Sequence, residues 1–418
     1  MDLEVFGGSP LKGEIRISGA KNAAMKMIAA ACLSSREIEL KSVPEILDIK
    51  TMLEIFQNLG GEVKREGRGH FILLGKNIKN GNLNFDIVSK LRGSIVFLGP
   101  LLARFKEVIL PFPGGCQIGA RPIDTHLRLF SDLGAEIKEE NGTYRLKLKR
   151  IKSKSVILDE LSVTATENAI LFASFYNIPL EFRALALEPE IIDLIEILQK
   201  MGVKFEGVGT PFLKIKGTAG KFKRVFHTVL PDRIETGTWA ILAAVSKGRT
   251  VLKNNRPDTL DSFFNKLEQA GAKIDLKGDK ITVSAKGYFK PVDIDTRTYP
   301  GFPTDLQAPF SIIMTQARGS SRIFETLFED RLQYLRELKK MGANAKILNP
   351  HTAVIHGPTV LYGKTIHTLD LRAGATLVLA ALIARGKSLI KNIEIVDRGY
   401  EDWEEKIKSL GAKIKRIS

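Results

Sequence analysis

Helical and strand periods alternate along this chain. Met52, Ile55, Phe56 and Leu59 recur at i, i+3, i+4 and i+7, and residues 403–410 repeat this spacing, which is typical of an amphipathic helix with one buried face. A glycine follows each of these helices, and alternating apolar and polar residues come next. The pattern predicts a helix, a left-handed glycine cap and then a strand.

One phrase with this pattern occurs six times. Its copies are NLGGEVK, DLGAEIK, KMGVKFE, QAGAKID, KMGANAK and SLGAKIK. Their first glycines follow one another at intervals of 68 to 74 residues and are Gly60, Gly134, Gly202, Gly271, Gly342 and Gly411. A period kept over the whole chain indicates a repeated structural unit.

A more apolar helix precedes each phrase, as at 23–33 and 377–384, and segments rich in Val, Ile and Leu flank it. Each unit of about 70 residues is therefore predicted to be strand–helix–strand–helix–strand. One such unit is too small to bury its apolar helix, but three units packed together enclose those helices. We expect an α/β fold with two lobes of three units each.

Composition narrows the class of protein. With 418 residues the chain is longer than a single hydrophobic core usually accommodates, so we expect more than one domain. Residues 1–10 lack the basic and apolar regions of a secretory signal. No apolar stretch reaches the roughly 20 residues that cross a bilayer. The two cysteines, Cys32 and Cys116, argue against a disulfide framework and fit a reducing cytoplasm. No Cys, His or carboxylate spacing resembles a metal site, so we expect no metal.

The net charge of +16 has two interpretations. A basic surplus attracts nucleic acid, and it also suits acidic small molecules. Most basic residues are interleaved with acids, as in Lys64-Arg65-Glu66, and no aromatic-rich RNA signature accompanies the densest run, KRIKSK at 149–154. We favour a solvated surface with an anion-binding cleft.

Polar residues stand at equivalent places in the six copies, where the first helix is expected to begin. They precede the phrase glycine by 36 to 42 residues and are Lys21, Arg92, Thr166, Arg233, Asp305 and Arg372. A second set precedes the second helix and comprises Arg121, Arg256, Arg331 and Arg398. Helix N-termini expose N–H groups that favour anions. Any single arginine here can belong to a surface ion pair, but the shared register favours one rim of each lobe facing the other.

The segment PFPGGCQIGARPID (111–124) is rich in proline and glycine, so we expect a mobile surface loop. Cys116 lies at its centre and Arg121 follows. A thiol in an exposed loop near cations is expected to have a lowered pKa and raised reactivity. The alternative is an incidental unpaired cysteine, which is the role we expect for Cys32 inside its apolar helix.

Three acidic residues near arginines have two interpretations each. Asp305 opens an apolar helix, where it serves either as an N-cap or as a base that removes a hydroxyl proton. Asp370 beside Arg372, and Asp232 beside Arg233, pose a similar choice between a structural role and a site. Spacing alone leaves these alternatives open.

Five segments closely resemble the UDP-N-acetylglucosamine 1-carboxyvinyltransferases, also called UDP-N-acetylglucosamine enolpyruvyl transferases. They are ISGAKNAA (17–24), PGGCQIGARP (113–122), LPDRIETGT (230–238), FPTDLQA (302–308) and DLRAGATLVLA (370–380). The likeness extends over essentially the whole chain. It implies two inside-out α/β barrels of three repeats that close over the substrates. The N-terminal lobe would be 22–229 with the cysteine loop 111–122, and the C-terminal lobe would be 1–21 with 230–418.

Members of this family transfer the enolpyruvyl group of phosphoenolpyruvate to the 3-hydroxyl of UDP-N-acetylglucosamine and release phosphate, by addition and then elimination. The resemblance implies this reaction here, as the first committed step of peptidoglycan synthesis and hence of cell wall biogenesis, cell shape and cell division. It implies a cytoplasmic transferase without cofactor, nucleic-acid partner or membrane span, and we favour a monomer. Fosfomycin, which alkylates the family's loop cysteine, would target Cys116.

The resemblance also implies residue roles. Cys116 would be a general acid that can form a covalent adduct with phosphoenolpyruvate, Asp305 would be the base toward the sugar hydroxyl, and Lys21 would complete the catalytic set. Phosphoenolpyruvate would be bound by Lys21, Asn22, Arg121 and Arg398. The UDP-sugar would be bound by Asn22, Arg92, Arg121, Pro122, Ile123, Asp124, Thr125, Ser162, Val163, Asp305 and Leu327. Further charged cleft residues would be Arg233, Arg331, Asp370 and Arg372.

The chain departs from the family pattern in three places. Glu160 stands where members usually carry a basic residue, Thr164 stands where they have glycine, and the segment 297–305 is about two residues shorter than usual. The first two bear on contacts to the uridine part, and the third bears on the path into Asp305.

Three other functions compete with this interpretation. The sister enzyme that makes 5-enolpyruvylshikimate 3-phosphate shares fold and donor, but it lacks the cysteine loop and has a Lys-Ser pair in place of Lys21-Asn22. A basic RNA-binding or RNA-end-processing protein would bind RNA in a salt-dependent way without releasing phosphate. An inactive paralogue would act as a scaffold, although Cys116 and Asp305 are both retained.

Overall fold

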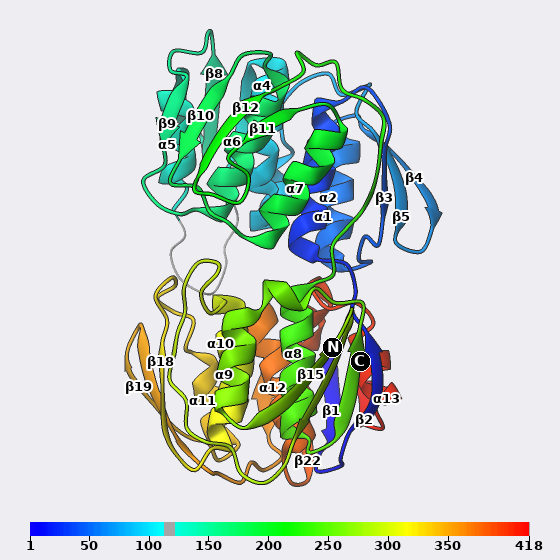
Figure 1. The fold of residues 1–418 in the computed structure, drawn as a ribbon, viewed down its shortest axis with the longest axis vertical. Helices are drawn as coiled ribbons and strands as arrows, with labels where there is room; N and C mark the ends of the chain where they lie inside the picture. Colours follow the sequence, from blue (N-terminus) through cyan, green and yellow to red (C-terminus); the bar gives the residue numbers. More distant parts are fainter. Residues whose placement is uncertain (113–121, 418) are drawn as a thin grey trace. The chain divides into compact units, whose positions relative to one another are not determined.

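The computed structural model describes residues 1–112 and 122–417, which form two compact units (Figure 1). The N-terminal unit comprises 19–112 and 122–230, and the C-terminal unit comprises 1–18 and 231–417. The sequence placed the boundaries at 21–22 and 229–230 instead. The first crossing comes earlier because Gly19 is already packed in the N-terminal unit, where a Cβ would lie 1.7 Å from the carbonyl oxygen of Ser42.

Each unit contains three copies of one β–α–β–α–β–β motif. In the C-terminal unit the first copy consists of β2 (Lys12–Arg16), α8 (Arg233–Val245), β14 (Arg249–Lys253), η3 (Pro257–Thr259), α9 (Asp261–Gln269), β15 (Ala272–Lys277) and β16 (Lys280–Ala285). The second consists of β17 (Ile294–Asp295), α10 (Thr304–Thr315), β18 (Gly319–Phe324), α11 (Tyr334–Lys340), β19 (Asn344–Asn349) and β20 (Thr352–Gly357). The third consists of β21 (Thr365–His367), α12 (Leu371–Ile383), β22 (Lys387–Lys391), η4 (Ile393–Arg398), α13 (Trp403–Ser409), β23 (Lys413–Ile417) and β1 (Asp2–Phe6).

The N-terminal unit repeats this order, except that the first strand of its second copy is reduced to one parallel bridge between Asn82 and Ile109. Its first copy consists of β13 (Val225–Thr228), α1 (Lys21–Ala30), η1 (Ala31–Leu33), β3 (Ile38–Lys41), α2 (Leu47–Asn58), β4 (Glu62–Gly67) and β5 (His70–Leu74). The second consists of α3 (Phe85–Val88), η2 (Arg92–Phe97), α4 (Leu98–Phe105), β6 (Glu107–Pro111), α5 (Asp124–Asp132), β7 (Ala135–Glu140) and β8 (Thr143–Leu148). The third consists of β9 (Ser155–Ile157), α6 (Val163–Phe175), β10 (Leu180–Arg183), α7 (Pro189–Lys200), β11 (Lys204–Glu206) and β12 (Phe212–Lys216).

The predicted unit with one strand after the second helix was wrong, because that segment folds back as a hairpin. In the copy formed by β6 to β8, Asn141 and Gly142 both have positive φ, 50° and 74°, as a tight two-residue turn between twisted strands requires. The hairpin pairs antiparallel with the strand before it, as β8 does with β6, whereas the first strand of a copy pairs in parallel, as β2 does with β14.

Strands from distant parts of the chain complete single sheets within each unit. Strand β13, from residues just before the second crossing, completes the first sheet of the N-terminal unit beside β3. Strand β1 lies between β22 and β23, so the two chain termini are side by side (Figure 1). Residues far apart in the sequence therefore share single sheets.

Apolar helices fill the centre of each unit, and the sheets surround them (Figure 1). Helix α10 packs against both α8 and α12, and every residue of α12 from Arg372 to Leu382 is buried. Burial alternates along strands such as β1 and β12, which leaves one sheet face against the helices and the other toward solvent. A helix that is apolar on all sides needs such a position, so the arrangement confirms the predicted inside-out α/β fold.

The phrase glycines confirm the predicted helix caps. Their φ angles lie between 97° and 106°, and each glycine comes two residues after the last residue of α2, α5, α7, α9, α11 or α13. A side chain at such a φ is strained, which explains why glycine recurs in all six copies. No helix within 1–112 and 122–417 has the length and apolarity to cross a bilayer.

Candidate active site

The N-termini of the central helices of the C-terminal unit gather three acidic residues. Asp232 caps α8 by accepting from the backbone N–H groups of Ile234 and Glu235, at 2.8 and 3.0 Å. Asp370 caps α12 in the same way, from Arg372 and Ala373. These two carboxylates therefore have the structural role that the sequence left open.

Asp305 does not have that role. It is the second residue of α10, and no side chain among the described residues caps this helix. Its carboxylate instead accepts from two arginines, with Oδ1 2.5 Å from Arg331 Nη2 and Oδ2 3.0 Å from Arg372 Nη2. Both arginine side chains are 5 % exposed, whereas the Asp305 side chain is 27 % exposed. The pairing holds one accessible carboxylate on two buried cations.

Charge keeps these arginines protonated inside the protein. Burial by itself lowers the pKa of Arg331, but the carboxylates of Asp305, Asp370 and Glu325 outweigh it and raise the pKa. Burial also lowers the pKa of Arg372, but Tyr400 and Asp305 outweigh this effect and raise the pKa. The group is therefore a fixed charge network, which a reaction that develops charge can use.

The other predicted residues of this unit lie at element ends. Arg233 is the first residue of α8, with its guanidinium carbon 5.8 Å from the ring centre of Tyr299. Arg398 is the last residue of η4. Leu327 follows β18 and is 39 % exposed. The geometry thus joins Asp305, Arg331 and Arg372 directly, and Asp370 through its electrostatic effect on Arg331.

The N-terminal unit has its own polar group at helix starts. Lys21 begins α1, and its Nζ lies 2.9 Å from Asp48 Oδ2, with both side chains nearly buried. Asn22, next along α1, is half-buried. Arg92 begins η2, as predicted for a helix start. In the third copy the predicted Thr166 is the fourth residue of α6 rather than the first, because Ser162 is the N-cap.

Two hydrogen bonds join helix α5 to the segment before α6 and to the first turn of α6. Thr125 donates to Glu160 at 2.9 Å, and His126 Nε2 lies 2.9 Å from Thr164 Oγ1. Burial, and then the nearby charge of Arg92, lower the pKa of His126 to about 4, so this imidazole is neutral at physiological pH. The two departures from the family pattern, Glu160 and Thr164, are therefore partners of adjacent residues on one helix.

The remaining expected UDP-sugar residues surround these contacts. Pro122 is exposed, Ile123 is buried, Asp124 begins α5 and Val163 begins α6. Cys116 and Arg121 lie outside the described residues. Cys32 is fully buried, and this burial raises the pKa of its thiol, so it has the inert role expected of it.

Known proteins resemble the chain over its full length. A family model described as EPSP synthase (3-phosphoshikimate 1-carboxyvinyltransferase) matches residues 5–407. A UDP-N-acetylglucosamine 1-carboxyvinyltransferase of Koribacter versatilis is 42% identical over 416 residues, covering 99% of this chain and 96% of the relative. One of Helicobacter pylori strain P12 is 42% identical over 417 residues, covering 99% of both. The chain belongs to the UDP-N-acetylglucosamine 1-carboxyvinyltransferase family.

Solved structures of more distant enolpyruvyl transferases share the fold. The enolpyruvyl transferase NikO from Streptomyces tendae has a TM-score of 0.91 at 24% identity, covering 100% of this chain and 98% of that one. EPSP synthase from Acinetobacter baumannii has a TM-score of 0.73 at 18% identity, covering 100% of both. The fold is therefore shared with the enolpyruvyl transferase NikO and with EPSP synthase.

Sequence reasoning missed four residues that contact the expected site. Asp48 pairs with Lys21, Tyr400 interacts with Arg372, and Thr304 and Glu325 form hydrogen bonds behind Arg331 and Asp305. Only Thr304 has a sequence signal, because it is adjacent to Asp305 at the start of an apolar helix. The other three depend on contacts between segments that lie apart in the chain.

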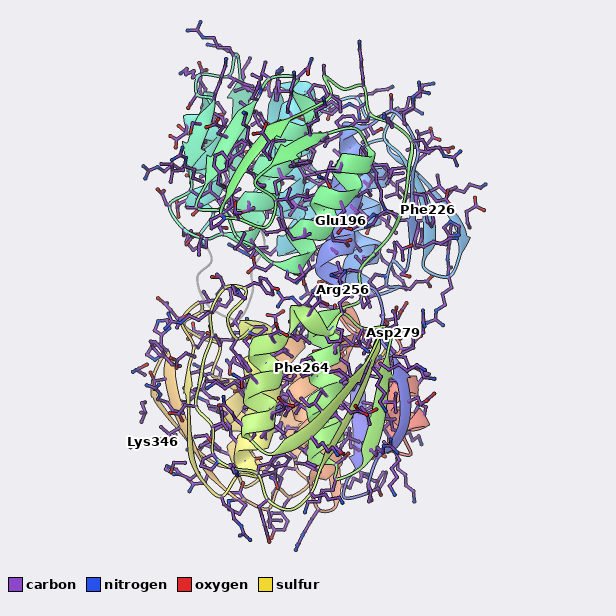
Figure 2. The ribbon with its side chains drawn as sticks, viewed as in Figure 1. Glu196, Phe226, Arg256, Phe264, Asp279 and Lys346 are labelled. Atoms are coloured by element: carbon purple, nitrogen blue, oxygen red, sulfur yellow. The ribbon has the colours of Figure 1, made fainter. Side chains whose placement is uncertain are left out.

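A possible metal-ligand group exists that spacing did not reveal. Side-chain atoms of Asp193, Glu196 and His227 lie within 4.8 Å of one another, and Figure 2 shows Glu196 on α7. His227 Nε2 lies 2.8 Å from Asp193 Oδ1, and its Nδ1 lies 3.0 Å from Lys200 Nζ. Since the lysine ammonium donates to Nδ1, Nε2 carries the proton that bonds Asp193. Both imidazole nitrogens are thus in use, and this cluster holds the strand β13 to α7.

Proposed function

We propose that this family member transfers the enolpyruvyl group of phosphoenolpyruvate to the 3-hydroxyl of UDP-N-acetylglucosamine with release of phosphate, at the first committed step of peptidoglycan synthesis. The observation that carries the proposal is Asp305, an accessible carboxylate fixed by two buried arginines in a chain whose 42%-identical relatives carry that transferase name. We further propose that the enzyme works in the cytoplasm as a monomer.

Asp305 is the base in this proposal. Its carboxylate takes the proton of the sugar 3-hydroxyl while the oxygen forms a bond to C2 of phosphoenolpyruvate. The two arginines fix the orientation of the carboxylate, because each holds a different oxygen atom. A base held in one orientation needs no reorganisation when the hydroxyl arrives.

The N-terminal unit supplies most of the substrate-binding groups in this proposal, and Leu327 and Arg398 of the C-terminal unit supply the rest. Helix starts at Lys21 and Arg92 combine a cationic side chain with backbone N–H groups, which attract phosphate and carboxylate groups. Lys21, Asn22, Arg121 and Arg398 would bind phosphoenolpyruvate. Arg92, the stretch 121–125, Ser162, Val163 and Leu327 would bind the UDP-sugar.

Proton transfer at C3 completes the chemistry. Cys116 would give its thiol proton to C3 of phosphoenolpyruvate as the sugar oxygen adds to C2, which yields a tetrahedral adduct. The Cys116 thiolate then takes a proton back from C3, the electrons of that C–H bond re-form the double bond, and the C2–O bond to phosphate breaks with its electron pair leaving on phosphate. The sequence of steps conserves atoms and charge without a redox step, so we propose that no cofactor takes part.

Phosphate release tests the proposal directly. The protein is mixed with phosphoenolpyruvate and either UDP-N-acetylglucosamine or shikimate 3-phosphate, and released phosphate is measured. We expect turnover with the nucleotide sugar alone. Release with shikimate 3-phosphate alone would instead support the activity named in the matched family model, and salt-dependent RNA binding without any release would support the RNA-binding alternative.

The Cys116→Ala variant tests the general acid. We expect it to lose most activity and to resist alkylation by fosfomycin, as followed by intact mass. Full retention of phosphate release in this variant would remove the assignment of Cys116.

A further inference from the structure

Glu325 is a fully buried carboxylate with no assigned role. It follows β18 and is 0% exposed. Its Oε1 accepts from Thr296 Oγ1 at 2.9 Å and from the backbone N–H of Leu327 at 3.0 Å, and its Oε2 accepts from Thr304 Oγ1 at 2.7 Å. A buried carboxylate costs several kcal/mol to desolvate, and these three donors are neutral. Its position therefore needs an explanation beyond an ion pair.

Thr304 connects Glu325 to the arginine that holds Asp305. Arg331 Nη1 donates to Thr304 Oγ1 at 2.8 Å, and Arg331 Nη2 donates to Asp305 Oδ1 at 2.5 Å. An arginine only donates, so the threonine oxygen accepts from Arg331 and its single proton must point to Glu325. The hydrogen bonds thus run in one direction, from Arg331 through Thr304 to the Glu325 carboxylate.

The charges around Asp305 determine how strong a base its carboxylate is. The hydrogen bonds from Arg331 through Thr304 to Glu325, called the threonine relay below, are part of those surroundings. Two guanidinium groups bonded to one carboxylate favour its ionised form and make it a weak base. A second carboxylate on the far side of Arg331 opposes that effect. Among the described residues, the titratable groups that act on Asp305 or its two arginines include Arg331, Arg372, Glu325, Asp370, Asp232, Tyr400 and Tyr334. Asp370 and Asp232 are committed to helix caps, which leaves Glu325 as the carboxylate joined to Arg331 by the threonine relay.

We propose that Glu325 is a positioning residue that keeps Asp305 basic. One of its oxygens partly balances the positive charge of Arg331 through the hydrogen bonds of Thr304. The other oxygen holds the backbone N–H of Leu327. This inference rests on the proposed function of Asp305 as the base. The electrostatic effect of Glu325 on Arg331, which contributes to the raised pKa of that guanidinium, supports the coupling that the hydrogen bonds define.

The Glu325→Gln variant separates the two tasks of this carboxylate. The glutamine oxygen still accepts from Thr296 and Leu327, but the amide nitrogen facing Thr304 is a donor and cannot accept its proton. The relay is broken while the shape and the Leu327 contact are kept. We expect kcat for phosphate release to fall about tenfold, with the KM for the nucleotide sugar changing less than about twofold.

The pH profile distinguishes this role from a merely structural one. Removing a nearby negative charge favours ionisation of Asp305, so the acidic limb of the kcat profile should move to lower pH by about one unit. Glu325→Asp retains the charge, and its limb should stay near the wild-type position. Thr304→Val should shift the limb in the same direction as Glu325→Gln, whereas Thr304→Ser keeps the relay and should behave as wild type.

A buried glutamate elsewhere in the same repeat provides the matched control. Glu337 on α11 is 7% exposed and pairs with Lys340, outside the Asp305 network. Glu337→Gln should leave the limb unchanged even where it lowers the melting temperature. A correctly folded Glu325→Gln enzyme with wild-type kcat and an unmoved limb would overturn the proposal.

A stability cycle tests the coupling without any turnover. The unfolding equilibrium constants of wild type, Glu325→Gln, Asp305→Asn and the double variant are measured in urea. Each single variant changes the unfolding equilibrium constant by some factor. We expect the factor for the double variant to differ from the product of the two single factors by at least about threefold, because both side chains act on Arg331. Additive effects would reject the coupling. If the wild type releases no phosphate from the nucleotide-sugar mixture, the proposed function fails, yet this cycle still decides the link between Glu325 and Asp305.

Discussion

Two helix starts in each unit differ in how their N–H groups are satisfied, although Ser162 caps α6 of the N-terminal unit and no side chain among the described residues caps α10 of the C-terminal unit. In the C-terminal unit, α8 and α12 begin with the carboxylate caps Asp232 and Asp370. In the N-terminal unit, no side chain among the described residues caps α1 or η2, which begin with Lys21 and Arg92. Uncapped N–H groups beside a cation attract anions, whereas capped ones do not. The same repeat thus has uncapped helix starts beside cations in one unit, which we propose bind the substrate anions, and a carboxylate held by two arginines in the other.

The largest expected effect comes from removing that carboxylate. Asp305→Asn leaves the shape of the pair with Arg331 and Arg372 but cannot take a proton, so kcat for phosphate release should fall about 10² to 10⁴-fold. Thermal unfolding near the wild-type temperature would show that the fold is intact. A variant that is folded and turns over at the wild-type rate would mean that the C-terminal unit does not supply the base.

A second test addresses the anion-binding end. Lys21→Ala removes the ammonium beside Asp48, so kcat/KM for phosphoenolpyruvate should fall about 10² to 10³-fold because a donor to the substrate anion is lost. Steady-state kinetics with phosphoenolpyruvate varied at saturating nucleotide sugar measures this. Lys21→Arg keeps the charge and should recover part of the loss. Equal losses for both variants would indicate that shape, rather than charge, matters at the start of α1.

The pH dependence of stability tests a buried residue of the N-terminal unit, His126, beside the expected substrate site. The pKa of His126 is lowered from its ordinary 6.5 to about 4, so the unfolded chain takes up a proton before the folded one does. Its contribution to stability is intact above pH 6.5 and is lost as the pH falls toward 4, by roughly 3 kcal/mol in total. Urea unfolding of wild type and His126→Asn at pH 7 and pH 4 should show a smaller pH effect in the variant. An identical effect in both proteins would place the titrating group elsewhere.

The smallest expected effect concerns the departures from the family pattern. Glu160 is exposed and accepts from Thr125, so replacing it by lysine removes one negative charge near the expected nucleotide site. The combined Glu160→Lys and Thr164→Gly variant should lower the KM for the nucleotide sugar by about threefold, since exposed charges contribute little. The KM for phosphoenolpyruvate serves as the internal control and should not change. A rise in the nucleotide-sugar KM would show that these residues aid binding as they stand.

Much of the fold could be predicted because its signals are local. The helix periods around Phe56 and Trp403 and the recurring glycines gave the repeat, the caps and the central apolar helices. The hairpins were missed because the two strands of each one share a single stretch of alternating residues, as β7 and β8 do around Asn141 and Gly142. The last copy differs, since β1 takes the place of its second strand beside β23. The site was only partly accessible, since the family resemblance indicated Asp305 but gave no sign of Glu325.

The sequence by itself determined the six copies of the repeat, the two helices in each copy and the family, because periodicity and motif spacing are read within short windows. Tertiary structure determined which acidic residues cap helices and which one pairs with two arginines. Those contacts join Asp305 to Arg331, 26 positions away in the same repeat, and to Arg372, 67 positions away in the next one. They form only once the chain has folded around one core. The pairing of β13 with β3 also depends on tertiary structure, since strands that lie far apart in the sequence meet only in the folded sheet.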